Sequence, residues 1–184
     1  MQELSLHILD LAQNSVAAGA TLVEIAVRED RARDRLTIAI TDNGRGMTAQ
    51  QAQRVTDPFY TARTTRKVGL GIPFFKMAAQ QTGGSFQLQS RPGGGTCVQG
   101  IFVPSNVDCL PLGDMAETFC ALVGCNPGID FVYTHEVDGR GYHADTRQFR
   151  QVLEDVPLSE PAVLAFIRNY IKENSESLLQ DPSA

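Results

Sequence analysis

The sequence has no apolar stretch that approaches the roughly 20 residues needed to span a bilayer. Its first residues, MQELS, contain no basic cluster and no long apolar run follows, so a secretory leader is not indicated. Excess positive charge is also missing, because 16 basic residues stand against 21 acidic ones and the net charge is −5. This balance argues against surfaces for nucleic acid or anionic membranes, both of which need clustered Lys and Arg. We therefore expect a cytoplasmic protein that binds neither.

The number and spacing of the cysteines indicate a reducing compartment. The 4 cysteines form no C-x-x-C pair. They stand at Cys97, Cys109, Cys120 and Cys125, and only the last two are close in sequence. We interpret them as free thiols in a reducing compartment, in preference to a metal or redox site.

Hydrophobic periodicity predicts an α+β fold for the first part of the chain. Apolar residues recur at helical spacing over residues 4–18, and they alternate over 21–28 and 36–41 as in an antiparallel hairpin. A second helix is expected over 73–82, followed by a second hairpin over 86–103. This order of elements suits helices packed on an antiparallel sheet.

The second part of the chain is predicted to be a small α+β extension. Residues 104–111 resemble a connector, so the expected domains are 1–104 and 111–184. The expected elements of the extension are a helix over 115–123, strands over 129–136 and 142–144, and a last helix from Ser159 onward. His135 and His143 flank the Asp138-Gly139 turn, and we expect them to face each other across a hairpin as a solvated pair.

Two polar residues stand out on the first predicted helix. Asp10 and Asn14 lie one turn apart and face the same way. Unpaired buried polar groups are costly, so both side chains need partners. A metal and a phosphate would supply them: Asn14 offers a neutral oxygen to Mg²⁺, and Asp10 could accept a proton from an attacking nucleophile. The alternative is that both only cap or cross-link neighbouring backbone, and the pair alone does not decide.

Two glycine-containing segments suggest ligand contacts. The segment DNGRGM at residues 42–47 follows a strand; its glycines allow close backbone approach to a flat ring, and its carboxylate can accept a hydrogen bond from an exocyclic amine. The segment GLG at 69–71 opens a helix, whose N-terminal N–H groups attract anions. Neither the P-loop pattern nor a complete G-x-G-x-x-G is present. Each segment alone is also explained by an ordinary turn.

Together, these segments occur in the order and spacing of a known superfamily. NS at 14–15 with AGAT at 18–21 resembles the asparagine-box helix of mismatch-repair ATPases. Residues 42–47 resemble the first glycine box of the gyrase, chaperone, histidine-kinase and mismatch-repair (GHKL) superfamily. Three further segments resemble histidine-kinase motifs: DPFYT at 57–61 the phenylalanine box, GLGI at 69–72 the second glycine box, and GT at 95–96 the last glycine-threonine pair.

The resemblance covers roughly residues 4–103 and implies both a fold and a ligand. The fold would be a two-layer α/β sandwich of the Bergerat ATP-binding type, with a mixed, largely antiparallel sheet. The ligands would be ATP and Mg²⁺, with Asn14 binding the metal, Asp42 accepting a hydrogen bond from the adenine amino group, and Asp10 in the place of a catalytic base. The remaining implied contacts are Gly44, Gly46 and Met47 around the ring, Thr96 supporting adenine, Phe59 anchoring a lid over 56–68, and Lys67, Gly69, Leu70 and Gly71 at the phosphates.

Three positions depart from the superfamily patterns. Asp10 stands where the ATPase branches have a glutamate and many histidine kinases an asparagine, so phosphoryl transfer remains open. Ala17 stands where histidine kinases often have a lysine, which removes one phosphate contact. Lys67 stands where the kinases commonly have a glycine, so the lid is stiffer or Lys67 itself reaches phosphate.

The functional expectation is an ATP-binding protein that acts on a separate protein. Histidine kinases carry their phosphoacceptor on a helical hairpin that normally precedes the ATP domain, whereas here that domain begins close to Met1. We expect an ATPase or kinase that phosphorylates or switches a partner; the alternative is a nucleotide-sensing adaptor that binds ATP without consuming it. A homodimer is possible, although the short tail disfavours a mismatch-repair-type clamp. The arrangement also resembles small ATP-binding proteins of anaerobic bacteria that accompany iron hydrogenase subunits, which implies a redox partner.

Overall fold

The computed structural model describes residues 2–61 and 70–180 and consists of two layers. One layer is a six-stranded sheet with the order β3-β4-β2-β1-β5-β6. Its strands are β1 (Leu22–Asp30), β2 (Arg35–Asp42), β3 (Ser85–Ser90), β4 (Thr96–Phe102), β5 (Asp130–Val137) and β6 (Arg140–Asp145). All neighbouring strands are antiparallel except β1 and β5, so the expected mixed, largely antiparallel sheet is confirmed.

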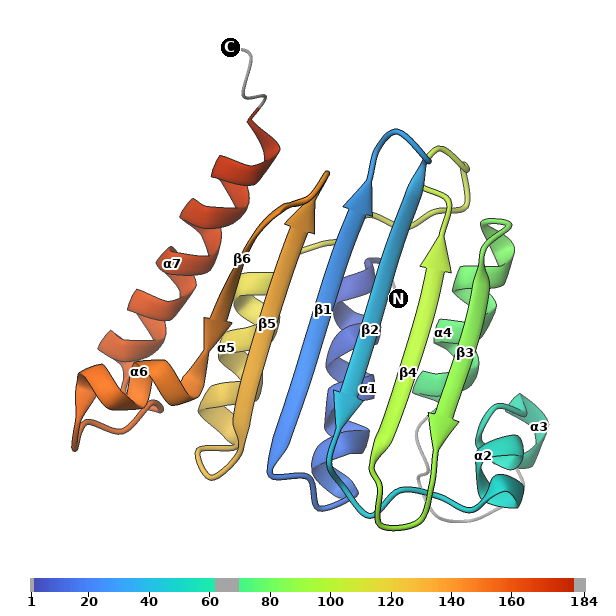
Figure 1. Ribbon diagram of the computed structural model, residues 1–184, viewed down its shortest axis with the longest axis horizontal. Coiled ribbons are helices and arrows are strands. Elements are labelled where there is room, and N and C mark those ends of the chain that lie inside the picture. The colour runs from blue at the N-terminus through green and yellow to red at the C-terminus, as the bar shows by residue number, and fades with distance from the viewer. Residues whose placement is uncertain (1, 62–69, 181–184) are drawn as a thin grey trace.

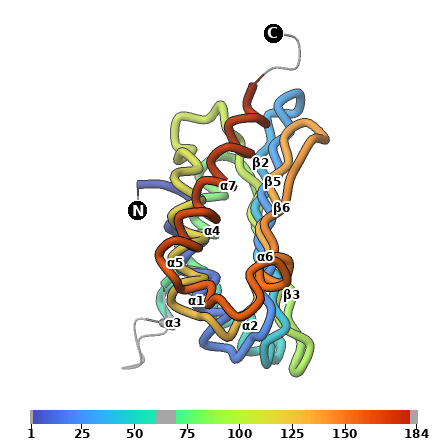
Figure 2. Tube along the Cα trace, turned by 90° about the vertical axis from the view of Figure 1, so that its left-hand side faces the viewer, coloured from blue at the N-terminus to red at the C-terminus, as the bar shows by residue number. Residues whose placement is uncertain are grey.

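The second layer is made of α1 (Leu4–Ala17), α4 (Gly71–Gln81), α5 (Met115–Cys125) and α7 (Pro161–Leu179), which lie on one face of this sheet (Figures 1 and 2). Three short helices, α2 (Ala49–Val55), α3 (Pro58–Thr61) and α6 (Thr146–Leu153), lie near the ends of the strands. Helix α1 lies behind β1 and β2, α4 behind β3 and β4, and α5 behind β5 (Figure 1). The expected two-layer α+β architecture is therefore confirmed.

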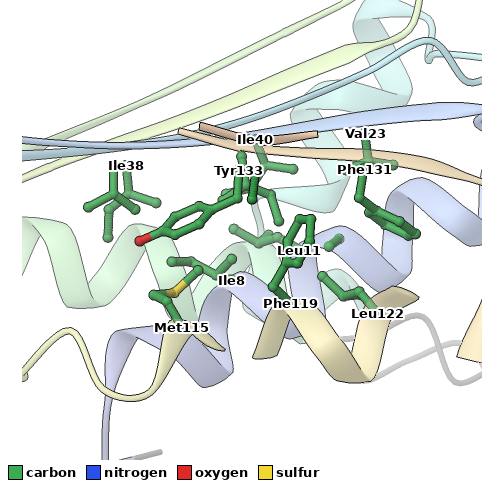
Figure 3. Close-up of a cluster of buried hydrophobic side chains, with 14 of the residues drawn as sticks. Ile8, Leu11, Val23, Ile38, Ile40, Met115, Phe119, Leu122, Phe131 and Tyr133 are labelled. Carbon is green, nitrogen blue, oxygen red and sulfur yellow. The ribbon is translucent and has the colours of Figure 1, made fainter. Parts of the chain in front are cut away.

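The core fills the space between the two layers. Buried residues alternate along β1 and β2, as side chains on a strand must when only one face is covered. Figure 3 shows how these side chains meet those of α1 and α5: Ile8, Leu11, Val23, Ile38, Ile40, Met115, Phe119, Leu122, Phe131 and Tyr133. Because the apolar face of α1 is committed to this core, the rotation of the helix about its axis is determined, and so is the position of its polar side chains.

The C-terminal extension continues the same sheet. Strand β5 pairs in parallel with β1 from Leu22↔Asp130 to Glu29↔Val137, and β6 follows as the edge strand. Helix α5 packs against α1 and α7. The division of the chain into residues 1–104 and 111–184 stays a prediction; the two parts share one sheet and one layer of helices.

The two histidines of the extension do not face each other. His135 is in register with Tyr142, whereas His143 is in register with Thr134, so the two imidazoles are on opposite faces of the sheet. His135 is 2% exposed, and its Nε2 lies 2.9 Å from Oε1 of Glu29. The prediction of a solvated pair is therefore wrong: the alternation along both strands sends one ring into the core and the other to solvent.

Within residues 2–61 and 70–180, none of the helices combines the length and the apolar character that crossing a bilayer would require.

Candidate functional site

A cavity of about 300 Å³ opens where α1 meets the ends of β2 and β4. Its walls are mostly apolar and carry a few polar side chains. The lining residues are Leu11, Asn14, Ser15, Ala17 and Ala18 from α1 and its C-terminal end, Ile40, Asp42, Arg45, Gly46 and Met47 from β2 and the following loop, and Val55, Ile72, Thr96 and Val98. An apolar cavity with few, well-placed polar groups is the usual form of a small-molecule site.

Asp42 is the acidic group on this cavity, and two donors hold its carboxylate. The hydroxyl of Ser15 donates to Oδ2 at 2.6 Å, and the backbone N–H of Gly44 donates to Oδ1 at 2.9 Å. Ser15 is buried on α1, and Asp42 is the last residue of β2. Each carboxylate oxygen accepts one of these bonds and keeps a lone pair for a ligand, since a carboxylate has about four acceptor positions.

The loop after Asp42 is attached to the connection between α1 and β1. The side-chain oxygen of Asn43 accepts hydrogen bonds from two backbone N–H groups at the start of β1, at 2.9 and 3.0 Å, and its amide donates to Oγ1 of Thr21 at 2.8 Å. The backbone N–H of Arg45 donates to the carbonyl of Ala18 at 3.0 Å. A Cβ on Gly44 would lie 2.9 Å from that same carbonyl, so this position needs a glycine for close packing.

The two glycine loops also pack directly against each other. Gly46 has φ +65°, and a Cβ there would lie 1.9 Å from the carbonyl oxygen of Arg91. Gly95 has φ +73°, and its Cβ would lie 1.9 Å from the carbonyl oxygen of Asp42. Only glycine combines this backbone conformation with so close an approach. These glycines therefore shape the cavity by bringing its two loops together.

Ser90, at the end of β3, joins the same two loops. Its hydroxyl oxygen accepts the backbone N–H of Met47 at 2.9 Å, donates to the carbonyl of Gly95 at 3.0 Å, and lies 2.8 Å from Oγ1 of Thr96. Thr96 is in register with both Ser90 and Asp42, on the strand between them. Ser90, Thr96 and Asp42 are thus neighbours in register across three strands, and a hydrogen bond joins the first two.

The opposite end of the cavity lies where α4 begins. A Cβ on Gly71 would lie 3.1 Å from Cβ of Asp10 and 3.8 Å from Nδ2 of Asn14, so the first residue of α4 packs against α1. Leu70, the N-cap, makes no side-chain capping bond. The N-terminus of α4, with its positive dipole end, therefore lies beside the Asp10 and Asn14 side chains.

The structure brings most of the expected site residues together. Those that line the cavity are Asn14, Asp42, Gly46, Met47 and Thr96; Gly44 supports Asp42, and Asp10 and Gly71 are adjacent at the α4 end. Leu70 is 39% exposed, and Phe59 is 77% exposed and does not line the cavity, so the role of Phe59 as a lid anchor stays a prediction. Lys67 and Gly69 lie outside the described residues.

Ser15 and Ser90, which hold the polar groups of the cavity in place, have no assigned role in the sequence-based prediction. Ser15 follows Asn14 and lies four residues after the buried Leu11, so helical spacing alone could have directed it inward. Ser90 gives no such signal, because its partners become neighbours only through the pairing of β3 with β4.

Comparison with known families agrees with this geometry. The family model for histidine kinase-, DNA gyrase B-, and HSP90-like ATPases matches residues 2–106. The chain is 37% identical over 110 residues to the sensor protein kinase FleS of Pseudomonas aeruginosa, covering 60% of this chain and 27% of FleS. It is 32% identical over 101 residues to the sensor histidine kinase ZraS of Klebsiella oxytoca, covering 54% of this chain and 21% of ZraS. The chain thus spans well under a third of these relatives.

A solved structure shares the fold. The MutL ATPase domain of Aquifex aeolicus, in complex with ADP, superposes with a TM-score of 0.51 at 16% identity, covering 84% of this chain and 70% of that domain. The family match extends over more than half of the chain and includes each element that lines the cavity. The chain therefore belongs to the histidine kinase-, DNA gyrase B- and HSP90-like ATPase family, and its ATP-binding domain has the two-layer GHKL fold.

Proposed function

We propose that this chain is a cytoplasmic protein that binds ATP with Mg²⁺ in the cavity, and that it acts as a histidine-kinase-like ATPase or kinase on a separate protein partner. The observation that carries the proposal is the Asp42 carboxylate, held by Ser15 and Gly44 on an apolar cavity. The kinase assignment is supported by relatives such as FleS and ZraS, which are sensor kinases.

The base of ATP would lie at the Asp42 end. The oriented carboxylate would accept a hydrogen bond from the 6-amino group of adenine, and such a charge-assisted bond is stronger than a neutral one. Ile40 and Val98 are cross-strand partners on the floor of the cavity, and Ile72 and Met47 add further apolar wall. A flat aromatic ring gains free energy by leaving water for such surroundings.

The phosphates and the metal would lie at the α4 end. Within the described part of the chain, no group of three or more His, Cys, Asp or Glu side chains is placed to hold a metal. This fits Mg²⁺, which is commonly held by one or two protein oxygens together with substrate phosphates and water. Asn14 lines the cavity and would supply the amide oxygen, and the N-terminus of α4, which lies beside Asn14, would face the phosphates. When bound, Mg²⁺ would neutralise phosphate charge.

Asp10 is the proposed general base. It lies one turn before Asn14 and packs against Gly71, so its carboxylate is close to the proposed phosphate end. From there it would accept the proton of an attacking water or of a partner's side chain, while the N–H groups of α4 hold the phosphates in place.

The test of binding is calorimetric titration of the protein with ATP and Mg²⁺. Replacing Asp42 by Asn keeps the shape but removes the charge, and we expect a loss of roughly ten- to a hundred-fold in affinity, the size of one charged hydrogen bond. Asp108→Asn, on the exposed connector, serves as the matched control. No ATP binding by the unmodified protein, or equal binding by Asp42→Asn, would contradict the proposal.

A second candidate is a nucleotide-sensing adaptor that binds ATP without consuming it. The observation that favours it is that Asp10 does not itself line the cavity, although its neighbours do. Asp10→Asn separates the two candidates, with radiolabelled ATP turnover and partner capture as readouts. Loss of turnover with intact ATP binding supports the enzyme. An unmodified protein that binds ATP and captures a partner, but turns over no ATP with that partner present, supports the adaptor.

A further inference from the structure

The hydrogen bonds of Ser90 determine which way the hydroxyl of Thr96 can act. Ser90 has one hydroxyl hydrogen and two acceptor positions. The carbonyl of Gly95, 3.0 Å away, can only accept, and the N–H of Met47, 2.9 Å away, can only donate. With the hydrogen used on Gly95 and one lone pair used by Met47, Ser90 has one acceptor position left.

Thr96 occupies that position. Its Oγ1 lies 2.8 Å from Oγ of Ser90. With the Ser90 hydrogen on Gly95, the hydrogen between the two hydroxyls has to come from Thr96. With all three partners satisfied, the Thr96 hydroxyl has no hydrogen left for a ligand and presents only lone pairs to the cavity. Asp42, its neighbour across the strands, is a carboxylate and also only accepts.

The polar edge of the cavity between β2 and β4 is therefore made of acceptors. The hydroxyl of Ser15 adds no donor, because its hydrogen is used on Asp42 at 2.6 Å. A ligand that packs against this edge has to supply N–H groups. The 6-amino group of adenine supplies two, whereas hypoxanthine supplies one at N1, and its 6-oxo group would place a third acceptor against Asp42 and Thr96.

We infer that Ser90 is a positioning residue for base recognition: by taking the hydrogen of Thr96, it makes this edge select 6-amino purines over 6-oxo purines. The inference rests on the proposed function, because it concerns how the same cavity reads the base of a nucleotide. Ser90 does this without touching the ligand, since its bonds run to the two loops and to Thr96. In its absence, the Thr96 hydroxyl is free to rotate and donate to a 6-oxo group.

Arg45 carries N–H donors on the same cavity, so its effect on the choice of base also has to be measured. It lines this cavity and also an adjacent one of about 410 Å³, together with Thr48, Gln51 and Pro92. If its guanidinium sets the preference for the base, changing Ser90 will have no effect on that preference, and changing Arg45 will.

The experiment measures the affinities of the full chain for ATP and for inosine triphosphate, which differ only at the 6-position pairing edge. For Ser90→Ala, we expect the ratio of the two affinities to narrow roughly ten-fold, the effect of one buried hydrogen bond, mainly through tighter binding of inosine triphosphate. Ser90→Thr keeps the hydroxyl, so its ratio of affinities should equal that of the unmodified protein. Ser85→Ala, at the exposed far end of β3, is the matched control and should leave it unchanged.

Thr96→Val provides an independent arm, because it removes the acceptor itself. If Ser90 acts through Thr96, the ratio for Ser90→Ala with Thr96→Val should equal that for Thr96→Val alone. Thermal melting of each variant without ligand shows whether it is folded. Where Ser90→Ala does not fold, the affinity ratios of Ser90→Thr and Thr96→Val are compared: the first should match the unmodified protein and the second should be narrower, and equal ratios would contradict the inference.

The outcomes separate this inference from the proposed function. The role of Ser90 is overturned if Ser90→Ala weakens the binding of both nucleotides equally, or if only Arg45→Ala narrows the ratio of the two affinities. Either result leaves ATP binding in place. Binding of neither nucleotide by the unmodified protein overturns both.

Discussion

The hydroxyl of Ser15 donates to Oδ2 of Asp42 across 2.6 Å, although the two residues are 27 positions apart in the sequence. This bond connects the C-terminal half of α1 to the end of β2. The residue before Ser15 is Asn14, the proposed ligand of Mg²⁺, so a single helix turn contacts both ends of the cavity. A shift of α1 would therefore disturb the base end and the metal end together.

Replacing Ser15 by Ala should weaken ATP binding roughly ten-fold, because Asp42 loses one of the two donors that orient its carboxylate. The unfolding free energy should fall by about 1–3 kcal/mol, since one oxygen of a half-buried carboxylate is left unpaired. Calorimetric titration and urea unfolding measure the two effects. Ser15→Thr keeps the hydroxyl and should retain most of the affinity; an unaltered affinity in Ser15→Ala would show that Asp42 needs no support from α1.

Gly46 and Gly93 form a matched pair for testing the contact between the two glycine loops. Both have positive φ, +65° and +71°, but a Cβ on Gly46 would meet the carbonyl of Arg91 at 1.9 Å, whereas one on Gly93 would meet nothing within 4 Å. Gly93→Ala should lower the unfolding free energy by about 1–2 kcal/mol, because of the backbone conformation alone. Gly46→Ala should cost clearly more and also reduce ATP affinity. If urea unfolding shows the same loss of unfolding free energy for both variants, the close approach of Gly46 to the Arg91 carbonyl is not important.

His7 should make the protein less stable at mildly acidic pH. Burial lowers the pKa of His7 below its ordinary value of 6.5, and the carboxylate of Asp10 only partly opposes this. The unfolded chain therefore binds a proton that the folded chain does not, as pH falls below about 6.5, and stability is lost in that direction. His7→Phe keeps an aromatic ring beside Phe75, whose ring centroid lies 6.3 Å from that of His7.

The measurement for His7 is thermal unfolding across the range from neutral to mildly acidic pH. The melting temperature of His7→Phe should fall less over this range than that of the unmodified protein. An identical slope for both proteins would mean that other groups cause the acid sensitivity.

Two tyrosines test how α7 is held to the sheet. The hydroxyl of Tyr142 lies 2.7 Å from Oγ of Ser175 and donates to the carbonyl of Ile171 at 3.2 Å, in a half-buried setting. The hydroxyl of Tyr170 donates to the carbonyl of His143 at 3.0 Å, in an exposed setting. Tyr142→Phe should lower the unfolding free energy by about 1–2 kcal/mol, and Tyr170→Phe by less, because exposed groups exchange their partner for water. A larger loss for Tyr170→Phe would contradict this assignment.

Local sequence patterns were sufficient to predict most helices and strands and to single out several candidate site residues. The alternation in β1 and β2, the helical spacing in α1 and the glycines of residues 42–47 each depend on neighbours within a few positions. The resemblance to the superfamily then identified Asn14, Asp42 and Thr96, which all line the cavity. The same local patterns could not say which residues face His135, since that depends on the register of β5 and β6.

By itself, the sequence determined the α+β class and the first helix and hairpin, because these follow from side-chain spacing. The roles of its glycine-containing segments toward a ligand came only from their resemblance to the superfamily. Only the tertiary structure decided that β5 pairs in parallel with β1, because parallel strands need a long crossover and no local signal names the partner. It also decided that Ser15 holds Asp42 and that the hydroxyls of Ser90 and Thr96 lie within hydrogen-bond distance. Such bonds form between segments far apart in the chain, and they exist only once packing has brought those segments into register.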